Sequence, residues 1–323
     1  MASLREIKDR IGSVRSTLKI TSAMKLVASA KLRKAQRAIE SLRPYERTLA
    51  EILAAVGPAV ASPQRADGNS MTGWRSPQTP CVASLPGEFA EKPIPDPPST
   101  TPAHDAPAAK GKTAIVAIAS NSSLCGGFNA NAARLALETI RACEGGVEVY
   151  PLGRKMAEAL KRAGYSSDQD YNDLVGHPSY EKSTALARSL AERFQQGEIG
   201  RVVLVYNRFR SASSQEPVAE EYLPFTAPVI QSENEGSPSA EEYILEPDAE
   251  ALVAQLLPQV MLLKFHAAIL DSAAAEQAAR TLAMQTASDN AEDLLGELTL
   301  EYNKGRQQKI TAEILDLLGG ASG

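Results

Sequence analysis

The hydrophobic residues at both ends of the chain recur at alternating steps of three and four, the spacing of a helix with one buried face. The last such segment covers residues 248–318, where Pro258 is the final proline and most residues are strong helix formers. Its apolar or small stripe consists of Leu252, Leu256, Val260, Leu263, Ala267, Leu270, Ala274, Ala278 and Thr281. At about 1.5 Å per residue, the pattern predicts a rod of roughly 105 Å that needs an equally long partner.

The N-terminal segment supplies that partner, because it has the a/d seam of a coiled coil. The seam consists of Leu4, Ile7, Ile11, Val14, Leu18, Thr21, Lys25, Ala28, Leu32, Ala35, Ile39, Leu42, Glu46, Leu49 and Leu53. Its polar members are Thr21, Lys25 and Glu46. The whole middle of the protein separates the two helices, so we expect them to be antiparallel. The first spans roughly 80 Å, and the second should extend past the N-terminus by something like 25 Å.

The middle of the chain alternates apolar strands with helices, which predicts a small α/β domain with a parallel sheet and right-handed crossovers. The expected strands are 113–120, 147–152 and 201–209, with a possible edge strand at 217–223, and the expected helices are 130–142, 155–163 and 183–195. The predicted fold class is therefore α/β plus a long antiparallel coiled coil, in which terminal helices flank a Rossmann-like domain. The domain boundaries are 1–57, 58–111, 112–246 and 247–323.

The second of these units begins at the helix-breaking pair Gly57-Pro58. Ten of the 20 prolines fall between residues 61 and 110. Large apolar residues are sparse there, so we expect the Pro-rich insert at 58–111 to be disordered or extended, a solvated tether outside any core.

Charge and composition narrow the class of protein. The chain has 323 residues, 43% hydrophobic, 5% aromatic, with a formal net charge of -5. Every charged residue between Asp9 and Glu40 is nevertheless basic: Arg10, Arg15, Lys19, Lys25, Lys31, Arg33, Lys34 and Arg37. This basic belt is either a solvated helix face or a surface for an acidic protein or nucleic acid. We find no signal-peptide core and no run of about 18 apolar residues, which predicts a cytoplasmic protein without a membrane span.

The sequence offers no catalytic, metal or cofactor site that we would predict. Cys81, Cys125 and Cys143 lack C-x-x-C or zinc spacing. The glycine turn at 123–127 lacks the spacing of a dinucleotide loop and the lysine of a P-loop, which favours a packing turn over a phosphate site. Cys125 within it is expected to be a buried thiol.

Several separated motifs resemble the gamma subunit of F-type ATP synthases. They are ITSAMKLVASAKLRKAQ at 20–36, SLCGGFN at 123–129, YNRF at 206–209, AARTLAMQTASDNA from Ala278 and YNKGRQQKITAE from Tyr302. The similarity covers both terminal helices and most of the α/β domain. Two features depart from that family: the insert is longer than the usual connection, and Asn121-Ser122-Ser123 stands where the family commonly shows Asp-Arg-Gly.

This resemblance implies a central rotor stalk that couples proton-driven rotation of a c-ring to ATP synthesis. The tip would lie inside a ring of three alpha and three beta subunits, and the α/β domain would rest with epsilon on the c subunits. Catalytic sites would lie on beta, so the chain itself would be no enzyme and would need no cofactor. Its implied location is peripheral, on the cytoplasmic face of the bacterial inner (plasma) membrane, with membrane contact through the c-ring alone.

The resemblance also implies site residues at subunit interfaces. Met24 and Lys25 would face an acidic loop of beta, and Arg280, Arg306, Gln307 and Thr311 would contact the surrounding beta subunits and each other. Simpler interpretations remain open: Lys25 leans out of the seam into solvent, and Arg280 is an ordinary exposed helix charge.

Two functions of other classes compete with the rotor. A coiled-coil scaffold that binds nucleic acid through the basic helix face would bind with a steep salt dependence, and no such binding is expected of a stalk. A Rossmann-type enzyme would show saturable nucleotide binding by the isolated chain.

Overall fold

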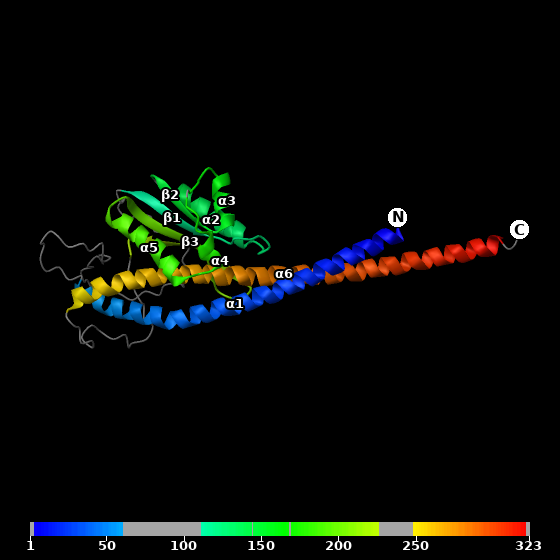
Figure 1. Cartoon of the computed structure of the whole chain (residues 1–323), viewed down its shortest axis with the longest axis horizontal. Helices are drawn as coiled ribbons and strands as arrows, with labels where there is room; N and C mark the ends of the chain where they lie inside the picture. Colours follow the sequence, from blue (N-terminus) through cyan, green and yellow to red (C-terminus); the bar gives the residue numbers. More distant parts are fainter. Residues whose placement is uncertain (1–2, 61–110, 144, 168, 226–247, 321–323) are drawn as a thin grey trace, which may run out of the picture.

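The computed structural model describes residues 3–60, 111–143, 145–167, 169–225 and 248–320. Two long helices, α1 (Leu4–Val60) and α6 (Ala249–Gly320), run side by side in opposite directions, and an α/β domain lies against one end of the pair (Figure 1). The Pro-rich insert predicted at 58–111 falls, apart from residues 58–60 and 111, outside the described residues. α1 passes through Gly57 and Pro58 and ends at Val60, three residues beyond the expected boundary.

Both long helices begin at a side-chain cap. The Ser3 hydroxyl accepts a hydrogen bond from the Glu6 backbone N–H at 3.2 Å, with glutamate in the position of a capping box. The Asp248 carboxylate accepts one from the Ala251 backbone N–H at 2.7 Å. These caps satisfy backbone donors that a helix N-terminus leaves unpaired, so each helix has a defined start.

The predicted antiparallel coiled coil is confirmed. All fifteen expected seam positions of α1 are buried or half-buried. The hydroxyls of Thr21 and Ser288 lie 2.8 Å apart in the seam, and Leu4 packs against Gly305 near the free end. α6 continues about 15 residues beyond Gly305, or about 22 Å, so the predicted overhang is present and forms the free tip of the molecule (Figure 1).

The prediction of one buried stripe on α6 was incomplete. The nine stripe residues are buried or half-buried, but a second face that includes Phe265, Ile269, Ala275 and Ala279 is buried as well. This second face packs against the α/β domain. A helix covered on two sides needs apolar residues nearly all round, and the sequence between 260 and 280 meets that need.

This composition also gives α6 a membrane-like profile. By length and composition alone, the segment Ala251–Leu315 is long and apolar enough to cross a membrane. We had expected no such stretch from the sequence. Burial of the helix between α1 and the sheet accounts for its apolar character from Val260 to Arg280.

The sheet has four strands in the order β2-β1-β3-β4. β1 (Lys112–Ile118), β2 (Val147–Leu152) and β3 (Ile199–Phe209) are parallel, as predicted, and β4 (Gln215–Leu223) is an antiparallel edge strand. The crossovers contain α2 (Phe128–Ala142), α3 (Arg154–Arg162), α4 (Asn172–Gly176) and α5 (Tyr180–Gln195). The short helix α4 was not predicted, and the other element ends differ from the expected ones by up to three residues.

The two faces of the sheet are covered by different helices. Val116, Ile118 and Leu204 pack with residues of α5 and α6 in one core. Ile115, Ala117, Val203 and Val205 pack with α2 and α3 in a second core. α6 therefore belongs to the coiled coil and to the domain core at once. Polar contacts reinforce this interface: the Tyr222 hydroxyl donates to the Met261 carbonyl at 3.0 Å, and Ser183 Oγ lies 2.8 Å from His266 Nδ1.

Gly153, between β2 and α3, has a φ of +97°, and a Cβ there would lie 2.2 Å from the Ala119 carbonyl oxygen. An unfavourable backbone conformation alone costs about 1–3 kcal/mol. Gly153→Ala should therefore lower the free energy of unfolding by more than that amount, because the added Cβ also clashes. Gly164→Ala is the matched control, because Gly164 has a φ of +91° and nothing within 4 Å of the added Cβ. Urea unfolding of both variants measures the difference, and equal losses would contradict the steric account.

Candidate functional site

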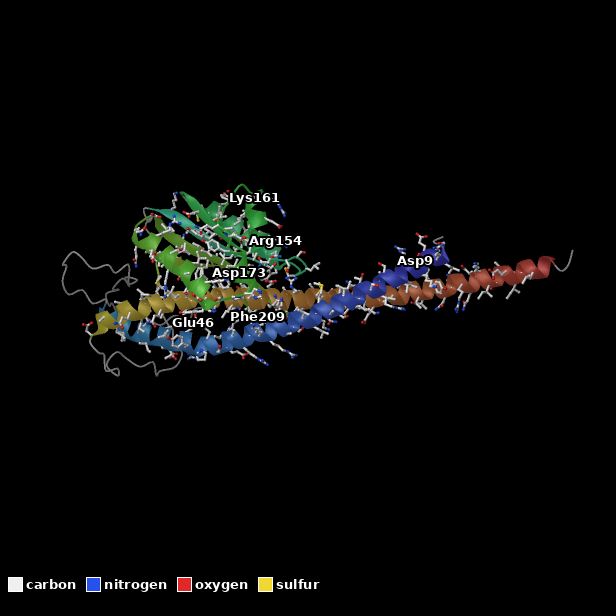
Figure 2. All side chains as sticks on the ribbon, in the orientation of Figure 1. Asp9, Glu46, Arg154, Lys161, Asp173 and Phe209 are labelled. Carbon is white, nitrogen blue, oxygen red and sulfur yellow. The ribbon has the colours of Figure 1, made fainter. Side chains whose placement is uncertain are left out.

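The predicted site residues lie at two levels along the coiled coil, because the helix register puts Arg280 within about one turn of Lys25. Figure 2 shows the long part of the shaft beyond the α/β domain, with Asp9 near its N-terminal end and Glu46 and Phe209 beside the domain. Met24 and Lys25 lie on α1 between Asp9 and Glu46. Arg306, Gln307 and Thr311 lie on the free end of α6.

Met24 and Lys25 are half-buried on α1, one turn from the Thr21–Ser288 contact. The antiparallel register places Lys25 opposite the buried Met284. Hydrophobic side chains beside this pair remain uncovered by α6: Ile20 is 60% exposed, Leu26 70% and Val27 57%. We call these three residues the α1 patch. Large apolar side chains left uncovered within two turns of one helix are typical of a surface that meets another protein.

The shaft is polarised in charge around this patch. Between Arg280 and Lys304 every charged residue of α6 is acidic: Asp289, Glu292, Asp293, Glu297 and Glu301. The basic belt of α1 runs alongside this part of α6, yet within the described residues no member of the belt forms an ion pair. The shaft therefore presents a basic side and an acidic side, whose attraction for partners depends on ionic strength.

Arg280 is buried, and its guanidinium is hydrogen-bonded to other residues of the same chain. Its guanidinium donates to the Ser123 carbonyl at 2.6 Å, to the Ser122 hydroxyl at 2.9 Å and to the Glu276 carboxylate at 2.6 Å. The side chains of Arg280 and Glu276 are each 10% exposed. Arg280 is thus no ordinary exposed helix charge, because it fastens the loop after β1 to α6. A contact between Arg280 and a beta subunit stays a prediction.

The glycine turn works as a packing turn in this arrangement. The Ser123 carbonyl in the turn and the Ser122 hydroxyl just before it accept hydrogen bonds from Arg280. Cys125 is 1% exposed beside Phe128 and Ala279, and burial raises the pKa of its thiol, which disfavours the nucleophilic thiolate. In the part of the chain that the structure describes, no three His, Cys, Asp or Glu side chains are grouped to hold a metal ion.

Asn121, which departs from the family pattern, has a local structural role. Its side-chain oxygen accepts a hydrogen bond from the Arg154 backbone N–H at 3.0 Å, and its amide donates to the Asn172 carbonyl at 2.7 Å. The residue therefore ties the loop after β1 to the starts of α3 and α4. An amide can donate to a carbonyl and an ionised carboxylate cannot, so asparagine suits this position.

The overhanging tip of α6 is bare in the single chain. Arg306, Gln307 and Thr311 are exposed, and the Thr311 hydroxyl donates to the Gln307 carbonyl at 3.0 Å. Apolar side chains are uncovered as well, at Ile310, Ile314, Leu315 and Leu317, with exposed fractions of 47% to 75%. Gln307, Thr311 and Leu315 help to line a shallow groove of about 450 Å³.

The structure therefore brings Gln307 and Thr311 together but not all six predicted residues. Arg280 and Arg306 are separated by about 39 Å along one helix. Sequence reasoning also missed Glu276, the partner of Arg280, although its position four residues earlier on the same helix was a usable signal. The charged residues around Glu46 were missed too, because they come from three distant segments.

These features define a class of protein: a long two-helix shaft with a compact α/β domain at one end and uncovered apolar and charged surfaces toward the other. The sequence matches the family model described as ATP synthase over residues 3–323. It is 43% identical to the ATP synthase gamma chain of Bacteroides fragilis and 36% identical to that of Flavobacterium johnsoniae. The first match covers 99% of both chains, and the second covers 99% of this chain and 98% of the relative.

Solved structures agree on the fold. A chain of the Euglena gracilis mitochondrial ATP synthase matches with a TM-score of 0.60 at 17% identity, covering 99% of this chain and 93% of that one. A chain of the rotor of the same enzyme matches with a TM-score of 0.56 at 18% identity, covering 95% and 98%. The protein belongs to the ATP synthase gamma chain family, and it is the central stalk subunit and not a catalytic subunit. The alternative of a nucleic-acid-binding scaffold gains no support from these matches.

Replacing Arg280 by methionine should leave the buried Glu276 carboxylate without its partner and lower the free energy of unfolding by about 3–5 kcal/mol. Combining Arg280→Met with Glu276→Leu removes both charges and should recover part of that loss. Urea unfolding of the purified chain measures both values. Arg47→Met is the control, because Arg47 forms an ion pair with Glu51 while 82% exposed. A single-variant loss no larger than that of Arg47→Met would contradict the buried clamp.

Proposed function

We propose that this chain is the rotating shaft of a proton-translocating ATP synthase. Torque passes between a c-ring, near the α/β domain, and a ring of three alpha and three beta subunits around the free part of the coiled coil. The single observation that carries the proposal is the division of the molecule: one helix, α6, is buried in the domain core at one end and bare at the other.

The physical properties of the two ends suit this division. At the domain end, α6 shares a core with β1, β3 and α5, so a force applied to the domain moves the shaft with it. At the free end, the uncovered Ile310, Ile314, Leu315 and Leu317 offer a surface with few directional bonds. Apolar contacts of this kind can be exchanged as the shaft turns, because they do not depend on fixed donor and acceptor positions.

The α1 patch and the basic belt are the proposed meeting points with the beta subunits. Met24 and Lys25 lie beside the patch, and a positive belt suits an acidic loop on the partner. Arg306, Gln307 and Thr311 at the tip would meet the upper part of the ring. The α/β domain would rest with the epsilon subunit on the c-ring, and membrane contact would occur through that ring, at the cytoplasmic face of the bacterial inner membrane.

Co-expression with alpha and beta subunits from the same source tests the assignment. The full chain should join them in a complex with ATPase activity, and removal of residues 306–323 should weaken assembly or coupling while the α/β domain stays folded. A chain that stays out of the complex, or a complex that forms equally well without it, would refute the proposal.

Reversing the charge of Lys25 should impair coupling more than assembly. In Lys25→Glu the seam residues Leu18 and Leu32 are unchanged, while the new carboxylate repels an acidic partner loop. Proton pumping per ATP hydrolysed, measured in membrane vesicles that contain the complex, should fall. Lys161→Glu is the matched control, because it makes the same charge change at an exposed position on α3, outside the basic belt. A wild-type ratio for Lys25→Glu, or equal losses in both variants, would argue against a specific role of Lys25.

A further inference from the structure

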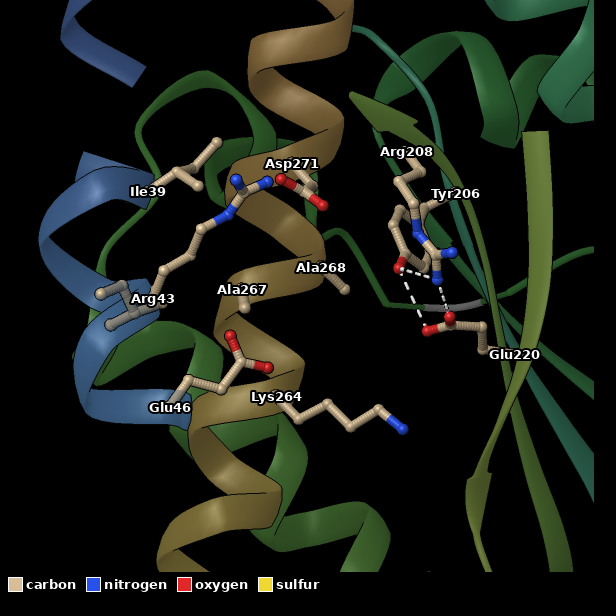
Figure 3. Close-up of a pocket in the computed structure, with 11 residues that line it drawn as sticks. Ile39, Arg43, Glu46, Tyr206, Arg208, Glu220, Lys264, Ala267, Ala268 and Asp271 are labelled. Atoms are coloured by element: carbon tan, nitrogen blue, oxygen red, sulfur yellow. Dashed lines mark hydrogen bonds and ion pairs between the residues drawn. The ribbon is translucent and has the colours of Figure 1, made fainter. Parts of the chain in front are cut away.

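Glu46 is an anomaly in the sequence, because it places a carboxylate on the seam of the coiled coil. The structure shows where that carboxylate goes. Glu46 lines a cavity of about 220 Å³ where α1, α6 and the sheet meet, with Ile39 on α1 and Ala267 and Ala268 on α6 (Figure 3). We call this place the junction cavity.

Six charged side chains surround the junction cavity, and each of the three structural units contributes one acid and one base. They are Arg43 and Glu46 from α1, Lys264 and Asp271 from α6, and Arg208 and Glu220 from β3 and β4. The charges therefore balance. These six side chains come from segments that are far apart in the sequence. They bring all three structural units together at one point.

The sheet contributes the directly bonded pair. The Arg208 guanidinium donates to Glu220, whose other carboxylate oxygen accepts from the Tyr206 hydroxyl at 3.1 Å. Within the described residues, the four helix charges form no ion pair closer than 4 Å with one another. Figure 3 shows Arg43 reaching across from α1 toward Asp271 on α6, and Lys264 extending toward the sheet. The Lys264 ammonium lies 5.7 Å from the centre of the Phe225 ring.

Burial makes these charges costly. It raises the pKa of Glu46, with a further increase from Asp271, and Lys264 and Arg43 oppose the shift. Burial also raises the pKa of Asp271, and the nearby Arg43, Arg208 and Arg210 oppose that increase. Burial lowers the pKa of Lys264. A raised carboxyl pKa means that the folded chain binds the proton more tightly than the unfolded chain. The protonated carboxyl groups of Glu46 and Asp271 therefore contribute stability that is lost as the pH rises through their folded-state pKa. In their ionised form these two groups do not stabilise the fold.

A set of charges that costs stability can still select one geometry. If the domain rotated about the shaft, or α1 slipped along α6, Glu46 would approach Asp271 or Glu220, and Arg43 would approach Arg208. These like-charge contacts are unfavourable, while in the observed arrangement each acid has at least one base near it. Glu46 with Asp271 and Lys264 with Arg208 are the like-charge neighbours that remain. A purely apolar junction would hold the three units together without distinguishing such neighbouring arrangements.

We propose that the junction charges are positioning residues that fix the angle of the α/β domain on the two-helix shaft, so that torque applied to the domain reaches both helices without slip. The role of these residues in rotation rests on the proposed function. The geometric part concerns the chain alone, and it can be tested without any partner.

The first test measures the orientation of the domain in the purified full chain. With the three native cysteines replaced by alanine, spin labels are attached at Arg162→Cys on α3 and Arg37→Cys on α1, both exposed, and the distribution of distances between them is recorded. The neutral pair Glu46→Gln with Lys264→Met should broaden that distribution by about twofold, in line with modest coupling energies. Its thermal midpoint should equal or exceed that of the parent chain. The swapped pair Glu46→Lys with Lys264→Glu should restore the parent distribution.

The control removes an exposed ion pair of the same domain, Arg201→Gln with Glu221→Gln, which faces no part of the junction cavity. It should leave the distribution unchanged. An unchanged distribution in the neutral pair would overturn the proposal. So would broadening in step with a lower thermal midpoint, because that result indicates a merely structural role. A swapped pair that folds but stays broad would also overturn it, since attraction between the two charges would not be responsible.

The second test introduces the neutral and swapped pairs into the chain with its native cysteines, Arg37 and Arg162, places these chains in the assembled complex, and measures proton pumping per ATP hydrolysed. The neutral pair should lower the ratio by about twofold, and the swapped pair should restore it. If the parent chain fails to enter the complex, the proposed function fails while the orientation result stands. If the parent complex is coupled and the neutral pair is equally coupled, the junction proposal fails alone.

Discussion

Two hydrophobic cores share the helix α6, which is buried on one side by α1 and on the other by the α/β domain. Between Val260 and Arg280 this helix is covered by α1 on one side and by the sheet and α5 on the other. Because one rigid helix serves two cores, the domain and the shaft cannot move independently without exposing apolar surface of both. Beyond Gly305 no described residue of either partner covers the helix, which ends as an exposed tip. A stalk subunit needs both conditions in one element.

The polar exceptions in these cores define geometry more than they add stability. The Thr21–Ser288 contact lies in the coiled-coil seam, where a paired hydroxyl favours one register over a slip to the next turn. Arg280 and Glu276 fasten the loop after β1 to α6. The junction charges lie where all three units meet. Each group would be costly if left unpaired, so a misplaced helix or domain is penalised.

Much of the architecture could be predicted because long helices carry a strong periodic signal. The seam from Leu4 to Leu53 set the helix pairing, and the difference in helix length gave the overhang. The double burial of α6 could not be read from one stripe, since a helix that is apolar all round does not say which partner covers which face. Arg280 likewise carried no sign of burial, because its acceptors at Ser122 and Ser123 are distant in sequence. The role of Glu46 required three segments to be placed in space.

We propose that this chain turns as one body inside its partners. The most direct measurement fixes the alpha and beta subunits of the assembled complex to a surface and follows a probe attached at Arg162→Cys on the α/β domain while ATP is hydrolysed. Our account predicts stepwise rotation of the probe in one direction that stops when ATP is removed. ATP hydrolysis at the normal rate with a stationary or randomly fluctuating probe would contradict it.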